Sequence, residues 1–198
     1  MSERTARRWI RDRGLPVHRA DERLFVNPVE LWEWAVEHRV EVSPRLLEQA
    51  RRSPETIPPV SALLAAGGIH HDVPGDTAEA ALRAVVERLP LPPGVDRAFL
   101  VAALAGREAM GSTGIGHGIA IPHVRNPIVL QVDEPRLSLC LLARPVDFGA
   151  VDGRPVHALF TVVSPTVPMH LRTLAALSWL LHDAELRRLL EARAPAAA

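Results

Sequence analysis

Apolar and polar residues alternate along most of the chain with periods that distinguish helices from strands. Spacings of three and four residues mark amphipathic helices, whereas short continuous apolar runs mark buried strands. Helices are predicted over 60–66, 77–89 and 98–110, strands over 118–121, 137–142 and 156–163, and a final amphipathic helical stretch from Pro168 to about Arg193. This order predicts an α/β fold with a mixed β-sheet and helices on its faces.

The first fifty residues follow a different pattern, with shorter elements. A helix is predicted between Ser2, a good N-cap residue, and Gly14, because apolar residues repeat on one face while arginines occupy the other. Two short strands around a polar turn are predicted within 17–26. The proline that follows Asn27 starts another helix. The residues expected to be buried by that helix are Leu31, Trp34 and Ala35.

A proline-rich junction separates this segment from the α/β part. Residues 53–59 contain three prolines, which forbid a regular helix and leave a stiff, extended connector. We therefore divide the chain into a segment 1–52, a linker 53–59 and a domain 60–193. The end of the first segment, 43–52, is predicted to be helical.

Charge and composition exclude several classes of function. All 23 basic residues are arginines, and they balance 23 acidic residues, so bulk charge does not drive binding to nucleic acid or membranes. Without lysine the chain has no Walker A loop, no Schiff-base chemistry and no kinase signature. A single cysteine, Cys140, and the lack of a signal-peptide region or a long apolar run predict a cytoplasmic protein without membrane insertion.

The stretch 107–123 concentrates the candidate chemistry. It holds four glycines within eight residues and ends at Pro122-His123, after a short apolar strand. The glycines do not fit a dinucleotide-binding fingerprint, since Ile119 occupies the third glycine position, nor a P-loop, which needs lysine. An isolated Pro-His pair is most often an ordinary surface feature, so the meaning of His123 depends on the whole string.

The whole string resembles the active-site signature of the fructose/mannitol-class enzyme IIA domain of the bacterial phosphoenolpyruvate-dependent sugar phosphotransferase system, a class that includes the nitrogen-regulatory IIA proteins. The similarity extends over about 60–193. It implies that His123 is phosphorylated, that His170 is a second active-site histidine and that Arg107 is the family's active-site arginine. It also implies a phosphoryl-binding loop, whose residues here are Ser112, Thr113, Gly114 and Gly116.

The chemistry of these residues suits such roles. A neutral imidazole is a nucleophile near pH 7, and the planar guanidinium of Arg107 can pair with two phosphoryl oxygens. His170 follows Thr166, an N-cap candidate, and Pro168, so the positive end of a helix dipole accompanies it. No cofactor and no metal are expected. The resemblance implies a histidine phosphocarrier protein, HPr or its nitrogen-branch counterpart, as donor, and an enzyme IIB or a regulatory target as acceptor.

The remaining histidines have plainer interpretations. His117 lies in the glycine-rich loop at a position that the family leaves variable, and we expect it to be solvated unless it touches the phosphoryl group. His70 and His71, expected on a loop, lack a third well-spaced ligand and are expected at the surface rather than on a metal. Structural roles are expected for His18, His38, His157 and His182.

The first segment resembles the excisionase-type, MerR-like winged helix-turn-helix without its first helix. Either the true start lies upstream of Met1, or the segment has lost DNA binding and acts as a docking element. An arginine-rich, solvated helix face is the plainer alternative. The residues that the resemblance places on DNA are Thr5, Arg7, Arg8 and Arg11 on the helix and Arg19 and Arg23 on the wing.

Together these observations predict a phosphotransfer protein that accepts a phosphoryl group on His123 and passes it on or uses it as a regulatory signal. The alternative is a DNA-binding transcription regulator in which the IIA domain only senses phosphorylation. A catalytically inactive scaffold is disfavoured, because Arg107, His123 and His170 are all present.

Overall fold

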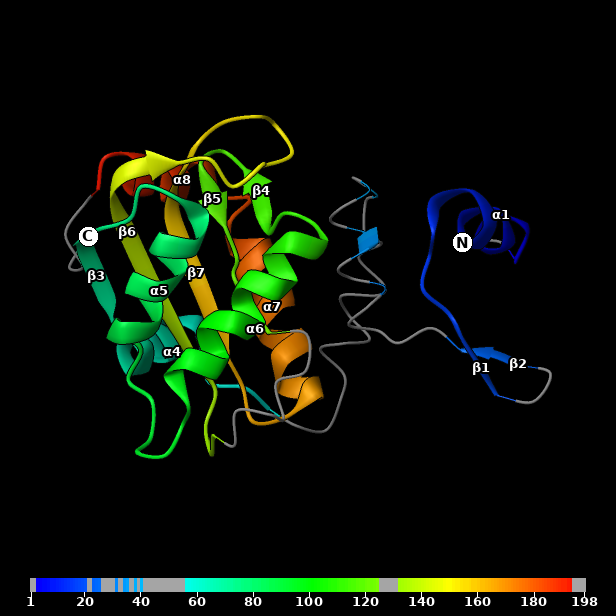
Figure 1. Cartoon of the computed structure of the whole chain (residues 1–198), viewed down its shortest axis with the longest axis horizontal. Helices are drawn as coiled ribbons and strands as arrows, with labels where there is room; N and C mark the ends of the chain where they lie inside the picture. The colour runs from blue at the N-terminus through cyan, green and yellow to red at the C-terminus, as the bar shows by residue number, and fades with distance from the viewer. Residues whose placement is uncertain are drawn as a thin grey trace.

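Most of the described chain forms a three-layered α/β domain, in which helices cover both faces of one β-sheet (Figure 1). The computed structural model describes residues 3–20, 23–25, 31, 34–35, 38, 40, 56–124 and 132–193. The expected mixed sheet with flanking helices is confirmed.

The sheet has five strands in the order β3-β6-β7-β5-β4. They span Ile69–Val73 (β3), Gly114–Gly116 (β4), Ile119–Ala120 (β5), Arg136–Val146 (β6) and Val156–Val163 (β7). β3 runs parallel to β6, and β5 parallel to β7, whereas β6 is antiparallel to β7 and β4 to β5. The middle of the sheet is the long pair β6 and β7, whose side chains are mostly buried because helices cover both faces.

Five helices pack on the sheet in two layers. They span Val60–Gly67 (α4), Ala78–Arg88 (α5), Arg97–Met110 (α6), Val167–Leu180 (α7) and Ala184–Glu191 (α8). Alternate residues of a strand point to opposite faces. Leu139 and Leu141 of β6 accordingly pack with α4, α7 and α8, whereas Cys140 and Leu142 pack with α5 and α6.

Side-chain caps define where four of these helices begin. Thr77, Asp96 and Thr166 each accept a hydrogen bond from the backbone N–H three residues ahead. At the start of α8, Asp183 accepts hydrogen bonds from the N–H groups of Glu185 and Leu186. This cap divides the stretch predicted over 168–193 into two helices, which corrects that prediction. Among the described helices none has both the length and the apolar character needed to cross a membrane.

Strand β3 corrects a second prediction, because His70 and His71 belong to it and not to a loop. β3 lies at an edge of the sheet, where His70 pairs with Cys140 of β6. Its first four side chains are half-buried or exposed, so the sequence has no continuous apolar run there. β6 also extends beyond the predicted 137–142 to Val146.

The described part of the N-terminal segment contains the predicted helix and both predicted strands. These are α1 (Glu3–Arg13) and the antiparallel pair of β1 (His18–Ala20) and β2 (Arg23–Phe25). Leu15, Trp34 and Ala35 form a small buried cluster, and the indole N–H of Trp34 donates to the backbone oxygen of Arg13 at 2.8 Å. The helix predicted over 43–52 lies outside the described residues.

Gly67 is a position where the fold has no room for a side chain. A Cβ there would lie 2.2 Å from the backbone oxygen of Leu137 in β6. We expect Gly67→Ala to lower the free energy of unfolding by about 1–3 kcal/mol, because α4 or β6 must move. Urea unfolding followed by circular dichroism measures the change.

Gly106→Ala in α6 is the matched control, since nothing lies within 4 Å of a Cβ built there. It should raise the free energy of unfolding by about 0.5–1 kcal/mol, because alanine favours the helix. Equal stability of the two variants would contradict the close contact between α4 and β6.

Candidate functional site

His123 lies just past the end of β5, inside the domain. The chain leaves β5 through Ile121 and Pro122, and His123 forms an isolated parallel bridge with Val162 of β7. Only 4% of its surface is exposed. The last part of β7 therefore holds the predicted phosphoacceptor in a protected position.

One hydrogen bond sets the tautomer of the His123 ring. Nδ1 lies 2.7 Å from the backbone oxygen of Ile121, which only accepts, so Nδ1 carries the proton. The lone pair of the neutral ring is then on Nε2. Nε2 thus points away from Ile121.

His170 of α7 is the partner of His123 in this site. The two ring centroids lie 5.4 Å apart at an angle of 46°. Thr166 caps α7 as expected, since its Oγ1 accepts from the N–H of Met169 at 3.3 Å, and His170 follows in the first turns of the helix. The structure thus brings together the two histidines that the sequence singled out.

Burial keeps His170 neutral. The side chain is fully buried, and this burial, with a smaller contribution from His123, lowers the pKa of His170 to about 3. Within the described residues neither ring nitrogen has a hydrogen-bond partner. A neutral imidazole of this kind can donate one hydrogen bond to a phosphoryl oxygen without adding charge.

Arg107 lies in the last turn of α6, where the glycine-rich loop begins. It is 7% exposed, and its Nη1 donates to the backbone oxygen of Gly111 at 2.8 Å. This bond satisfies a carbonyl at the C-terminal end of the helix. The guanidinium is therefore held at the base of the loop rather than extended into solvent.

The hydroxyl groups of the predicted phosphoryl-binding loop make bonds within the protein. Ser112 Oγ donates to the backbone oxygen of Phe148, and Thr113 Oγ1 donates to the carboxylate of Glu108, which also accepts from the N–H of Thr113 at 2.9 Å. These contacts tie the start of the loop to α6 and to the segment after β6.

The loop glycines allow the chain to approach that segment closely. A Cβ on Gly114 would lie 2.7 Å from the side chain of Ala150, and one on Gly116 would lie 3.2 Å from Asp152. Gly116 also has a φ of +96°, which side-chain-bearing residues rarely adopt. A contact of these four loop residues with a phosphoryl group stays a prediction.

His117 lies at the other end of β5 from His123. It is exposed, its N–H donates to Asp152 at 2.8 Å, and its Nε2 lies 2.9 Å from Nη1 of Arg187. Because a guanidinium only donates, Nε2 of His117 accepts in this contact. The exposed position of His117 agrees with the solvated side chain that the sequence analysis expects.

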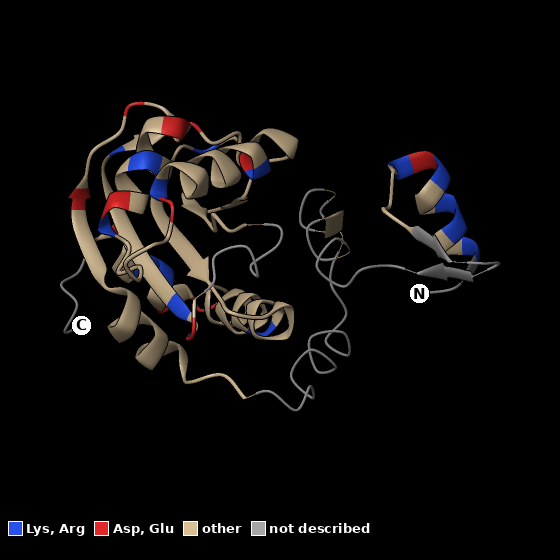
Figure 2. Cartoon of the chain, turned by 60° about the horizontal axis from the view of Figure 1, so that its bottom comes forward, with Lys and Arg blue, Asp and Glu red and all other residues tan. Residues whose placement is uncertain are grey.

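The other predicted contact residues lie elsewhere. Within the described residues no three His, Cys, Asp or Glu side chains gather as a metal would require. Arginines lie on successive turns of α1 (Figure 2). Thr5, Arg7, Arg8 and Arg11 line one hollow of α1 together with Arg4, while Arg19 lies in β1 and Arg23 in β2.

Two buried polar residues near the site escaped the sequence analysis. Ser164 directly follows β7, is fully buried, and its Oγ has no hydrogen-bond partner within the described part of the chain. Arg172, two residues after His170, is 7% exposed. Serine is also common in turns and at helix starts, so the presence of a serine after an apolar strand does not by itself predict that Ser164 is buried.

The low pKa of His170 makes a testable contribution to stability. The unfolded chain binds a proton at His170 below about pH 6.5, whereas the folded chain does so only near pH 3, so stability is lost as the pH falls between these values. His170→Gln should remove this dependence, a difference of about 2 kcal/mol between pH 6.5 and 5. Urea unfolding at both pH values measures it.

His182→Gln, which changes an exposed histidine just after the same helix, is the control and should unfold with the pH dependence of the original chain. If His170→Gln loses as much stability on acidification as the original chain does, His170 is not the buried neutral group described above.

Comparison with known families matches residues 62–198 to the family described as phosphoenolpyruvate-dependent sugar phosphotransferase system, EIIA 2. A nitrogen regulatory protein of Pseudomonas aeruginosa is 38% identical over 97 residues, which are 48% of this chain and 61% of that protein. The fructose-specific EIIA component of Haloferax volcanii is 37% identical over 100 residues, 49% of this chain and 63% of that protein. The matched part spans less than two thirds of either relative.

A solved structure shares this architecture and extends the similarity. The nitrogen regulatory protein IIA-Ntr of Neisseria meningitidis matches with a TM-score of 0.58 at 27% identity, over 66% of this chain and 89% of that chain. The family match begins at residue 62, so the comparisons give no support to the winged helix-turn-helix expected in the N-terminal segment. The matched range, 62–198, includes Arg107, His123 and His170. The chain belongs to the EIIA 2 family of the phosphoenolpyruvate-dependent sugar phosphotransferase system.

Proposed function

We propose that this domain accepts a phosphoryl group from a histidine phosphocarrier protein onto Nε2 of His123 and then hands it on. The observation that carries the proposal is the protected histidine pair, with Nδ1 of His123 bonded to Ile121 and the ring of His170 5.4 Å away. The family match over 62–198 supports a phosphotransfer role for the domain that contains both histidines.

The transfer needs only a nucleophile in line with the donor's N–P bond. The lone pair on Nε2 of His123 forms a bond to phosphorus while the N–P bond of the donor histidine breaks, and its electron pair returns to the donor ring. The proton on Nδ1 stays in place. The phosphorylated ring is thus positively charged, and the Ile121 carbonyl stabilises it through the existing hydrogen bond.

His170 acts as a neutral hydrogen-bond donor to the transferred group. Because its pKa is lowered to about 3 by burial, it stays uncharged at neutral pH and does not compete for the phosphoryl group as an ion-pair partner. A neutral donor stabilises the transfer while leaving the phosphohistidine able to release its phosphoryl group again. The N-terminal end of α7 adds favourable dipole potential for an anion.

Arg107 supplies positive charge for the phosphoryl oxygens in this proposal. Its bond to Gly111 fixes the guanidinium at the loop base, which lowers the entropy lost on pairing. Ser112, Thr113, Gly114 and Gly116 shape the loop that lies between Arg107 and His123. The bond of Ser112 to Phe148 and that of Thr113 to Glu108 keep the loop rigid. The guanidinium of Arg107 then needs little rearrangement during transfer.

Access to the site requires movement. His123 is only 4% exposed and His170 is fully buried, so a donor's phosphoryl group reaches Nε2 only after the surrounding side chains shift. Exclusion of water protects the phosphohistidine from hydrolysis between transfers. As acceptor we propose an enzyme IIB or a regulatory target, in keeping with the fructose-specific and nitrogen-regulatory names of the matched relatives.

Intact-mass measurement tests the proposal directly. After incubation with phosphoenolpyruvate, enzyme I and a histidine phosphocarrier protein, the chain should gain one acid-labile phosphoryl group, and His123→Ala should gain none. His117→Ala, which removes the exposed histidine at the other end of β5, should gain it normally. Uptake by folded His123→Ala, or no uptake by the folded original chain with HPr and its nitrogen-branch counterpart, would sink the proposal.

The two supporting residues should affect rate more than extent. We expect Arg107→Ala and His170→Ala each to slow phosphoryl uptake roughly 10- to 100-fold, since each removes a hydrogen bond worth about 1.5–3 kcal/mol in the transition state. Quenched-flow sampling followed by intact mass gives the rates. Uptake at the original rate in both variants would show that His123 needs neither residue.

A second candidate function is DNA binding by the N-terminal segment. The observation that favours it is the hollow of α1 lined by arginines, next in sequence to the β1–β2 hairpin. Arginine suits both phosphate and base-edge contacts. In this case the IIA domain would sense phosphorylation for a DNA-binding module.

Salt dependence distinguishes this candidate from an ordinary solvated helix. If α1 binds DNA, the double variant Arg8→Gln/Arg11→Gln should weaken binding and reduce the slope of log K against log salt by nearly two, about 0.9 for each lost phosphate contact. Arg83→Gln/Arg188→Gln removes the same charge from two exposed helical positions of the α/β domain and should leave the slope unchanged. DNA retention that is equal for both variants would exclude α1 as the contact.

A further inference from the structure

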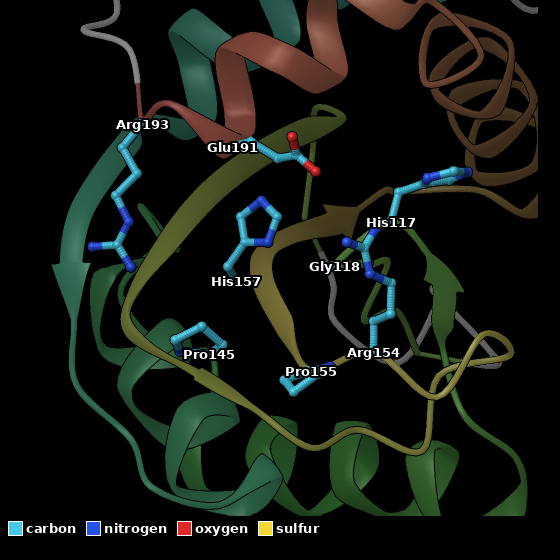
Figure 3. A pocket seen from close by; sticks show the side chains of 8 residues that line it. All are labelled: His117, Gly118, Pro145, Arg154, Pro155, His157, Glu191 and Arg193. Carbon is cyan, nitrogen blue, oxygen red and sulfur yellow. The ribbon is translucent and has the colours of Figure 1, made fainter.

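A pocket of about 340 Å³ lies at the opposite end of the sheet from His123. It is formed around His157, the second residue of β7, by the turn at His117, the segment before β7 and the end of α8 (Figure 3). Val162, which bridges to His123, lies five residues further along β7, or roughly 17 Å at the rise of a strand. This pocket is therefore separate from the histidine pair.

His157 is the unsatisfied group of the pocket. Its backbone N–H donates to Gly118 at 2.8 Å, which holds the residue in place, but its Nε2 is buried and has no hydrogen-bond partner among the described residues. A buried polar atom without a partner is costly, and such an atom points to a water, ion or ligand that completes it. In Figure 3 this ring lies between two arginines, with Glu191 across from it.

Burial and the neighbouring charges both act on the pKa of the His157 ring. Burial lowers the pKa of His157, Glu191 opposes this effect, and the charges of Arg193 and Arg154 lower the pKa further. A dianion bound between the arginines would reverse their effect on the ring. The imidazole would then take up a proton and become a third donor to the ligand.

The two arginines are placed differently. Arg193 is anchored, since its Nη2 donates to the backbone oxygens of Leu142 at 2.6 Å and Ala143 at 3.3 Å, and its Nη1 lies 3.6 Å from the carboxylate of Asp72. Arg154 is exposed on the other side of His157, and its backbone N–H bonds to Asp152, which fixes the turn that carries it. One cation is thus fixed at the wall of the pocket, and the other is able to close over a ligand.

We propose that this pocket binds a small phosphate monoester that also carries hydroxyl groups. Arg154, His157 and Arg193 line the pocket on different sides, and a phosphate has three equivalent terminal oxygens to pair with them, whereas a carboxylate has only two. Glu191 would repel a second anionic group but accepts hydrogen bonds from hydroxyls. The volume is at the lower end of the usual range for ligand pockets, which fits a small metabolite.

Nuclear magnetic resonance of the full chain tests the proposal with three probes. Glucose 6-phosphate should shift the signals of Gly118, Arg154 and His157 in a saturable manner and raise the pKa of the His157 ring. Inorganic phosphate should do the same with weaker affinity if the hydroxyls contribute, and glucose should have no effect. Shifts of equal affinity with both phosphates would assign the site to the phosphate group alone and overturn the requirement for hydroxyls.

Arg154→Gln should weaken binding of glucose 6-phosphate roughly 10- to 100-fold, because it removes one charge-assisted contact. Arg83→Gln removes the same charge from exposed α5 and is the matched control. Shifts that are absent with all probes, that spread evenly over the surface, or that weaken equally in both variants would overturn the proposal. Phosphoryl uptake by Arg154→Gln should be normal, which separates this site from the one at His123.

Discussion

The parallel pairing of β5 with β7 is the constraint on which both the turn at His117 and the site at His123 depend. β5 has only two residues, and β7 holds it through bonds from the N–H groups of His157 and Ala158 to Gly118, and from Val162 to Pro122 beyond its end. These bonds lead the chain from an exposed turn to buried His123. Because side chains alternate along a strand, a register shift of one residue would turn His123 away from His170.

Burial gives the two histidines of the site their chemical character. Burial disfavours the charged form of His170, and its pKa falls to about 3. The bond from Nδ1 of His123 to Ile121 determines which nitrogen of that ring carries the proton. Burial therefore keeps the ring of His170 neutral, and one backbone carbonyl sets the tautomer of His123.

His157 at the start of β7 and His170 on α7 are the same residue type in different electrostatic surroundings. Burial lowers the pKa of both His157 and His170. The second strongest influence on His170 is another imidazole, whereas His157 lies among Arg154, Arg193 and Glu191. Charged side chains therefore act on the pKa of His157 in addition to burial, whereas burial dominates at His170.

Much of this molecule follows from local patterns in the sequence. Apolar runs predict the central strands, cap residues such as Thr166 predict where helices begin, and the glycine-rich string ending at His123 identifies the family. Edge strand β3, the break at Asp183 and the bonds of Ser112 and Thr113 appear only in the tertiary structure. So do the contact of His123 with His170 and the pocket at His157. The reason is physical: periodicity reports how one element is buried, whereas these features depend on which distant elements the strand order brings together.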